Sequence, residues 1–511
     1  MNSEDRTGTP SRAPCLMGID LGTSSVKTVL MGRNGTVLSS HAVAYPIDSP
    51  QDGFAEQQPE LWWEAVAETI RAAMLKATVH PTDIAGVGFS GQMHGLVMVD
   101  EHHQAVRPAI IWPDRRSTAQ IKQAYEKLGR QAITKTTLNC LFPGFQLPSL
   151  LWIKENEPEN LKKTKWAVAP KDYLRLQLCG GPGPEEAATE ITDASATLAF
   201  DTGNRSWAEE LITELGLPRS LYPSCSEPHR SAGSVSKEAA KATGLLAGTP
   251  VVFGGADQAM QAIGNGIIGT GIVSTTIGTG GQVFAFSSRP VMNPDLNTHT
   301  FCHAVPGSWY VLGATLSAGL SLRWFRERIS GGQSFEEMSR EAENVPAGSN
   351  GLVFLPYLNG DRTPHLDPDA KGIFFGLTYK HTRAHMTRAI MEGVAFSIKE
   401  SLEIIEALDI PIDKVIASGG GAKSPLWRQI QADVYGKELF TVTNDEQACV
   451  GAAITAGIGT GIYRDFSDAC SQVVRFEDST TVPDPAAAET YRTRFEVYRE
   501  LYRRNRDLFT L

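Results

Sequence analysis

Near its start the chain alternates apolar and polar residues in a way that predicts a sheet built from hairpins. Residues 15–19 form a short apolar run that ends at Asp20, and the alternation over residues 26–30 predicts a second strand. Asn34-Gly35 is typical of a tight hairpin turn, and residues 37–44 then supply the returning strand. A sheet that opens with successive antiparallel hairpins differs from a dinucleotide-binding βαβ unit.

Further along the chain, buried strands alternate with amphipathic helices. Residues 59–77 predict a helix with Pro59 in its first turn and Glu60 at its positive end. Aromatic and apolar residues at helical spacing between 491 and 501 predict an amphipathic closing helix. Strands that run into polar or glycine-rich turns are predicted at residues 84–89, 250–256, 272–277 and 415–417.

The length of 511 residues favours two large domains, because a single hydrophobic core rarely grows past about 250–300 residues. Glycine turns at strand ends occur in both halves, at residues 20–24, 278–281 and 418–424. We therefore predict an α/β protein whose two similar domains face each other across a ligand cleft. Residues 1–14 are expected to form a flexible leader, 15–248 the first domain and 249–511 the second, with the last helix packing back on the first domain.

Composition restricts the partners of the protein. The 47 Lys and Arg residues against 57 Asp and Glu give a formal net charge of −10, so no nucleic-acid partner is expected. Seven cysteines lie far apart without a C-x-x-C pair, which favours reduced thiols and a cytoplasmic location. The polar start of the chain lacks the apolar segment of a signal peptide. No run approaches the roughly 18 apolar residues of a membrane span, so no membrane association is expected.

Asp20 and the turn Gly22-Thr23-Ser24 are the first candidates for chemistry. A carboxylate at a strand end suits Mg²⁺ that is held partly through water. The glycine lets the backbone approach a phosphate closely, and the Thr and Ser hydroxyls and amides can donate hydrogen bonds to it. Taken alone, however, the motif favours a simple strand–turn–strand in which Asp20 caps the turn.

Two further glycine turns, Gly278-Thr279-Gly280 and Gly419-Gly420-Gly421, have the same character. Each is typical of a tight turn, but three of them at strand ends favour a nucleotide held between two domains. The chain has no G-x-x-x-x-G-K-[ST] motif. Residues 264–269 match G-x-G-x-x-G, but they lack the required strand-then-helix setting, so we treat this match as chance.

Residues 19–24, together with Gly278-Thr279-Gly280 and residues 418–421, resemble the ATPase fold of actin, Hsp70 and sugar kinases. From residue 15 to the C-terminus the chain is similar to the FGGY carbohydrate kinases, and most similar to members that act on D-xylulose. The most specific parts are residues 91–95 (Gly-Gln-Met-His-Gly), 107–112, 170–175, 354–358 and 371–377. The resemblance implies two ribonuclease H-like domains, the first on the sugar side and the second on the nucleotide side.

The same resemblance implies a sugar and ATP as ligands, Mg²⁺ as cofactor, and a role for particular residues. It makes Asp257 the catalytic base, which accepts the proton of the sugar hydroxyl as that oxygen attacks the γ-phosphorus. It makes Met93, His94, Trp112, Asp114 and Gln258 the substrate contacts. It assigns the nucleotide to Gly22, Thr23, Ser24, Gly278, Thr279, Gly419, Gly420, Gly421 and Ser424, and the metal to Asp20.

Structural alternatives remain for several of these residues. Asp257 can instead cap a helix, although it is the only ionisable group among residues 251–286, which disfavours an ion pair with a sequence neighbour. His94 can be a core histidine and Trp112 a core tryptophan. Gln258 and Pro113 stand where some relatives carry Asn, which weakens the assignment of the sugar.

The leading hypothesis is an ATP-dependent kinase that converts D-xylulose to D-xylulose 5-phosphate. The alternatives are an FGGY kinase for ribulose, gluconate or glycerol, an Hsp70- or actin-like ATPase, and a non-catalytic sugar sensor. The ATPase alternative needs a substrate-binding β-domain or a polymerising surface, and neither is visible in the sequence. The sequence leaves a homodimer open.

Overall fold

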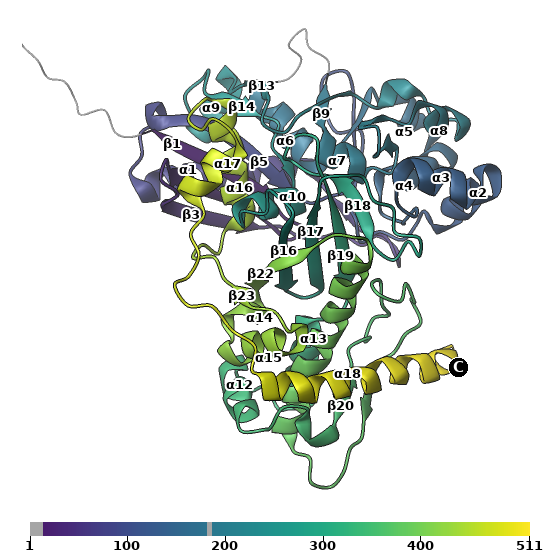
Figure 1. The fold of residues 1–511 in the computed structure, drawn as a ribbon. Helices are drawn as coiled ribbons and strands as arrows, with labels where there is room; N and C mark the ends of the chain where they lie inside the picture. Colours follow the sequence, from purple (N-terminus) through teal and green to yellow (C-terminus); the bar gives the residue numbers. More distant parts are fainter. Residues whose placement is uncertain (1–13, 181–186, 511) are drawn as a thin grey trace, which may run out of the picture.

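The computed structural model describes residues 14–180 and 187–510, which form two α/β domains (Figure 1). Apart from Pro14, the predicted leader lies outside the described residues. Among the helices of the described ranges, none combines the length and the apolar character that a bilayer crossing requires.

The first domain is organised by a sheet with the strand order β13-β14-β5-β1-β2-β3. Its strands are β1 (Cys15–Leu21), β2 (Ser25–Gly32), β3 (Val37–Ala44), β5 (Ile84–Gly91), β13 (Ser231–Ser234) and β14 (Pro250–Val252). β1 is antiparallel to β2 and parallel to β5, and β2 is antiparallel to β3. The predicted opening hairpins are therefore confirmed.

The second domain repeats this arrangement in the order β18-β19-β17-β16-β22-β23. Its strands are β16 (Gly271–Ile277), β17 (Gly281–Ser287), β18 (His299–Cys302), β19 (Trp309–Thr315), β22 (Ile412–Gly419) and β23 (Leu439–Phe440). β16 is antiparallel to β17 and parallel to β22, as β1 is to β2 and β5. The turns 22–24 and 278–280 thus occupy the same place in two copies of one fold.

Helices cover the faces of both sheets. α1 (Pro59–Ala77) packs on β2 and β3, and α13 (Arg383–Ala407) packs on β17 and β19. The other main helices of the first half are α2 (Thr118–Leu128), α3 (Arg130–Thr137), α4 (Gln146–Asn156), α6 (Pro170–Cys179), α7 (Ile191–Ala196) and α10 (Asp257–Gly264). Those of the second half are α11 (Gly319–Arg328), α12 (Phe335–Glu343), α14 (Gly420–Lys423), α15 (Pro425–Tyr435), α16 (Gln447–Gly459), α17 (Phe466–Val473) and α18 (Pro485–Asn505).

The domain boundary lies later in the chain than residue 249, where the sequence placed it. β14 and the short strand β15 (Gly255–Ala256) both pair with β5, so they complete the first sheet. α10 follows β15 directly, and the first strand of the second sheet begins only at Gly271. The crossover to the second domain therefore follows α10, because the sheet pairing of residues 250–256 assigns them to the first domain.

The prediction that the last helix packs back on the first domain is wrong. α18 packs on α15 and on β20 (Val353–Leu355) of the second domain, where Tyr491, Phe495 and Tyr498 are buried. The segment that returns to the first domain is α16, which packs on β1 and β5. Its backbone comes so close that a Cβ at Gly18 would lie 1.8 Å from the Cys449 carbonyl oxygen.

The edge of the second sheet is held against the helices of the first half. Asn139 Nδ2 donates a hydrogen bond to the Thr300 carbonyl oxygen at 2.8 Å, and the Cys302 backbone N–H donates to Ser195 Oγ at 3.0 Å. Both acceptor and donor backbone groups belong to β18. Figure 1 shows β18 next to α7 at this junction, which positions the aromatic residues of β18 and β19 beside the site described below.

Candidate active site

Asp20 and Ser90 lie opposite each other on the parallel strands β1 and β5. Ser90 Oγ donates a hydrogen bond to Asp20 Oδ1 at 2.6 Å. Burial raises the pKa of Asp20, whereas the bond from Ser90 and the charge of Lys27 oppose that rise. Lys27 is itself paired with Glu446 at the start of α16, with Nζ 2.6 Å from Oε2. The strand end thus carries a carboxylate with one oxygen held in place.

Asp257 begins α10, directly after β15 brings the chain to the same edge of the sheet. The backbone N–H of Gln258 donates to Asp257 Oδ1 at 2.7 Å. Burial raises the pKa of Asp257 to about 7, and the negative charge of Asp20 contributes to the rise. The structure therefore brings together two acids that are 237 positions apart in the sequence.

The Asp20 carboxylate fits Mg²⁺ that is held mainly through water and phosphate oxygens. Mg²⁺ is bound through one or two carboxylates, several waters and the phosphates of the substrate, and not by a cage of protein ligands. Across residues 14–180 and 187–510, no group of three or more His, Cys, Asp or Glu side chains is arranged as a metal cage. Asp20 is the residue that would hold the ion here, and its carboxylate offers the oxygen ligands that Mg²⁺ prefers.

Met93 and His94 follow β5 and form a wall next to these acids. His94 has a φ of 73°, and its ring stacks on Phe145 with a centroid distance of 3.5 Å. Its Nδ1 donates a hydrogen bond to the Ala196 carbonyl oxygen at 2.9 Å. Because burial lowers the pKa of His94 to about 3, the ring is neutral and its Nε2 is an acceptor.

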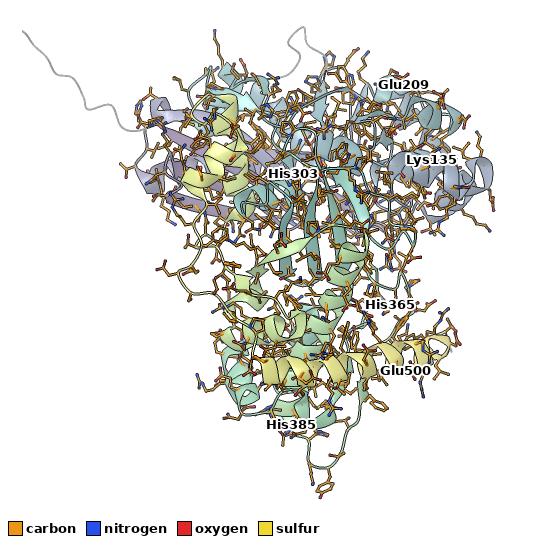
Figure 2. The ribbon with its side chains drawn as sticks, viewed as in Figure 1. Lys135, Glu209, His303, His365, His385 and Glu500 are labelled. Atoms are coloured by element: carbon orange, nitrogen blue, oxygen red, sulfur yellow. The ribbon has the colours of Figure 1, made fainter. Side chains whose placement is uncertain are left out.

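Tyr310 on β19 connects this wall to Asp257, and no sequence motif had indicated it. Its hydroxyl donates to Met93 Sδ at 3.7 Å. Burial raises the pKa of Tyr310, and the charge of Asp257 adds to that rise. His303, labelled in Figure 2, is buried, and its ring contacts the rings of Phe284 and Tyr310. The apolar and aromatic sequence of β19 predicts only a buried core strand. Only the position of Tyr310 in the fold shows that it lies beside the candidate site.

Trp112 and Asp114 have different environments although only two residues separate them. The side chain of Trp112 is exposed, and its Nε1 donates to Thr23 Oγ1 at 2.9 Å. The Asp114 carboxylate is buried, accepts the Ala55 backbone N–H at 2.7 Å and pairs with the Arg116 guanidinium at 2.8 Å. Against the expectation of a sugar contact, this carboxylate is used within the protein.

The turn Gly22-Thr23-Ser24 is supported from outside its own hairpin. The Gln57 side-chain amide donates to the Thr23 carbonyl oxygen at 2.8 Å, and the Tyr45 hydroxyl donates to the Gly22 carbonyl oxygen. Gln258 is half-buried directly after Asp257, in the first turn of α10. The turn and Gln258 therefore both lie at the edge of the first sheet that carries Asp20.

A cavity of about 570 Å³ opens in the second domain between β16, α11, α12, α14 and α15. Five of the residues predicted for nucleotide binding line it: Gly278, Thr279, Gly420, Gly421 and Ser424. Gly419 precedes them with a φ of 74°, and a Cβ there would lie 2.7 Å from the Ile277 carbonyl oxygen. Glycine is thus needed at 419 to let the strand turn tightly into α14.

Sequence reasoning missed the opposite wall of this cavity. It consists of Leu322, Arg323, Phe335, Ser339, Arg340, Met391 and Trp427. Arg323 donates to Thr279 Oγ1 at 3.2 Å, and Ser339 Oγ lies 2.9 Å from Ser424 Oγ. These residues come from α11, α12, α13 and α15, which show no motif. The packing of α11 and α12 on α13, and of α12 on α15, brings them to the glycine turns.

Comparison with known proteins agrees with this arrangement. The N-terminal and C-terminal domain profiles of the FGGY family of carbohydrate kinases match residues 15–264 and 273–460. The chain belongs to this family, and its two domains have the actin/Hsp70-like fold. It is therefore a sugar kinase by class.

Individual relatives refine the comparison. The chain is 37% identical to a xylulose kinase of Bacillus subtilis over 495 residues, which cover 97% of this chain and 98% of the relative. It is 30% identical to a gluconokinase of the same organism over 501 residues, covering 96% and 95% of the two chains. The crystal structure of a xyloylose kinase from Brucella ovis superimposes with a TM-score of 0.88 at 32% identity, covering 97% and 100%.

Proposed function

We propose that the protein transfers the γ-phosphoryl group of ATP to D-xylulose and produces D-xylulose 5-phosphate. Relatives of 33–37% identity over nearly the whole chain carry the name xylulose kinase, which supports this substrate. The gluconokinase at 30% identity makes gluconate the second candidate. The observation that carries the proposal is the position of the half-buried Asp257 at the start of α10, beside Asp20, where its pKa is raised to about 7.

Asp257 is proposed as the general base. A sugar hydroxyl is a poor nucleophile, so a carboxylate must take its proton as the oxygen attacks phosphorus. A base is most effective when its pKa lies near the working pH, since much of it is then deprotonated and it is still basic enough to accept the proton. Burial and the charge of Asp20 bring Asp257 to that condition. When bound, Mg²⁺ would neutralise charge on the phosphate oxygens.

The remaining residues are proposed to orient the two substrates. Neutral His94 presents Nε2 as an acceptor for a sugar hydroxyl, because its Nδ1 is occupied by the Ala196 carbonyl. The half-buried Gln258 side chain offers an amide beside the base. The cavity of the second domain is proposed to take the adenosine, with Met391 and Trp427 as apolar walls and Gly278 and Thr279 toward the phosphates.

A coupled assay of ADP release with D-xylulose, D-ribulose, D-gluconate and glycerol tests the proposal. We expect kcat/KM to be highest for D-xylulose. ATP turnover without any sugar would favour an Hsp70- or actin-like ATPase, and sugar binding without ADP release would favour a sensor. A clear preference for gluconate would replace the substrate and leave the kinase mechanism in place.

The setting proposed for this reaction is the cytoplasm. Among the described residues, six cysteines are free thiols: Cys140, Cys179, Cys225, Cys302, Cys449 and Cys470. This agrees with a reducing compartment. Size-exclusion chromatography with light scattering would test the homodimer that the sequence leaves open.

A further inference from the structure

Arg362 is a cation without a counterion next to the proposed sugar site. Across residues 14–180 and 187–510, its guanidinium makes no ion pair, and no side-chain hydrogen bond is formed by it. It lies over two aromatic rings, with Cζ 4.7 Å from the Phe142 centroid and 5.9 Å from the Phe145 centroid. Burial lowers the pKa of Arg362 to about 10, so the charge is held at a cost.

The loop that carries Arg362 is fixed on both sides. The preceding residue, Asp361, accepts the His365 backbone N–H at 2.9 Å. The following residue, Thr363, donates its backbone N–H to the Ala314 carbonyl oxygen of β19 at 2.9 Å and accepts the Ala314 N–H at 3.1 Å. The ring of His365, which Figure 2 labels, stacks on the ring of Tyr502 in α18. The contacts of the two neighbouring residues, Asp361 and Thr363, therefore fix the backbone position of Arg362.

Arg362 lies over Phe145, whose ring stacks on His94, so Arg362 lies next to the His94 wall. Its charge lowers the pKa of His94 and of His299, so it faces the His94 wall. From the base outward, the order is therefore Asp257, then Tyr310 with Met93, then His94 on Phe145, then Arg362.

An unpaired, partly buried guanidinium at such a place points to a ligand with oxygen acceptors. Arginine presents five N–H donors in a flat fork that matches two neighbouring oxygens. Removing a charged group from water is costly unless it is hydrogen-bonded, and the rings of Phe142 and Phe145 repay only part of that cost. Two adjacent sugar oxygens would satisfy the donors that the protein leaves free.

We propose that Arg362, delivered by the second domain, binds the C1 hydroxyl and C2 carbonyl oxygens of the sugar, opposite the hydroxyl that faces Asp257. This assignment rests on the proposed function, because D-xylulose with its C5 hydroxyl at the base extends its C1–C2 end toward the His94 wall. The contact joins the domains through the substrate, since His94 and Phe145 belong to the first domain. It makes Arg362 a specificity-determining residue for the far end of the acceptor.

A cycle of protein and substrate changes tests this contact. The kinetics of D-xylulose and 1-deoxy-D-xylulose, which lacks the C1 hydroxyl, are measured with the wild type, Arg362→Gln and Arg362→Lys. For D-xylulose we expect Arg362→Gln to raise KM roughly 10- to 100-fold, the usual effect of losing a hydrogen bond to a charged donor. For 1-deoxy-D-xylulose the rise in KM should be clearly smaller. With D-xylulose, the KM of Arg362→Lys should lie between those of the wild type and Arg362→Gln, because lysine keeps the charge without the forked set of donors.

Arg205→Gln is the matched control. Arg205 is another partly buried arginine over an aromatic ring, with Cζ 5.5 Å from the Trp309 centroid, and it joins the same two domains through the Ser308 carbonyl at 3.0 Å. We expect this variant to change the two substrates equally. Equal losses for both substrates in Arg362→Gln, or no change in KM, would overturn the proposal. Thermal unfolding of each variant separates a loss of folding from a loss of binding.

Failure of the proposed function has a different signature, because the wild type would then not phosphorylate D-xylulose. In that case the same variants are compared with D-gluconate and D-glucitol as competing acceptors in one reaction. These two compounds differ by a carboxylate at the end remote from the reacting hydroxyl. Arg362→Gln should remove any preference for gluconate over glucitol. A preference that survives the substitution would overturn the assignment of Arg362.

Discussion

The indole Nε1 of Trp112 donates a hydrogen bond of 2.9 Å to the hydroxyl oxygen of Thr23. The two residues are 89 positions apart, and each was predicted for a different ligand, Trp112 for the sugar and Thr23 for the phosphates. Their contact joins the strand end after β7 (Ala109–Ile110) to the hairpin turn between β1 and β2. We therefore expect a substitution at either position to affect the other through this bond.

A double-mutant cycle tests this connection. Trp112→Phe keeps an aromatic ring and removes the donor, and Thr23→Val keeps the shape and removes the acceptor. Each substitution should lower kcat/KM by about 2- to 10-fold, the usual contribution of one neutral hydrogen bond. The double variant should lose little more than either single one, because the same interaction is removed. Losses that simply multiply would show that the bond does not couple the two positions.

Replacement of the proposed base should abolish most of the chemistry and leave binding intact. We expect Asp257→Asn to lower kcat by roughly 10²–10⁴, the usual contribution of a general base. Sugar affinity, measured by calorimetry, should stay within a few fold. Asp484→Asn is the matched control, because Asp484 caps the first turn of α18 far from the site and asparagine caps equally well. A variant at 257 that keeps most of its turnover would remove Asp257 from this role.

The pH dependence of kcat/KM should report the same group. The pKa of Asp257 is raised to about 7, so the acid is mostly protonated below that pH and cannot accept a proton. We therefore expect activity to fall as the pH drops through about 7. Because the negative charge of Asp20 contributes to the raised pKa, saturating Mg²⁺ should move the midpoint to lower pH than limiting Mg²⁺. A midpoint near the ordinary pKa of aspartate at both concentrations would contradict this.

Gly420 offers a way to test the nucleotide cavity without disturbing the fold. A Cβ at this position would meet only the Ile277 carbonyl oxygen at 3.7 Å, an ordinary contact, and the residue lines the cavity. Gly420→Ala should raise the KM for ATP roughly tenfold, because a methyl group then occupies ligand space. The KM for the sugar should not change. Gly269→Ala, where nothing lies within 4 Å, is the control and should leave both values unchanged.

Domain closure is expected when both substrates bind. All residues that line the nucleotide cavity belong to the second domain, whereas Asp20 and Asp257 belong to the first. The phosphoryl group must therefore pass between domains, and closing them also excludes water as a competing acceptor. Small-angle scattering should show a smaller radius of gyration with D-xylulose and a non-hydrolysable ATP analogue than with either alone. An unchanged radius would argue against a large closure.

The sequence by itself determined the features that depend on neighbouring residues. Asn34-Gly35 and the glycine turns at 278–280 and 419–421 specify where strands end, because few other residues adopt such backbone conformations or allow such close approach. The chain length and the glycine turns in both halves likewise indicated two α/β domains. Asp257 stood out because no charged neighbour in the sequence accompanies it.

Only the tertiary structure decided which partners these residues meet. Long-range packing pairs residues 250–256 with β5 in the first sheet and returns α16 to β1. Burial also decides that Asp114 pairs with Arg116 inside the protein. The raised pKa of Asp257 and the unpaired charge of Arg362 depend on the same packing. Burial and long-range contacts set these properties, and no local pattern of residue types encodes them.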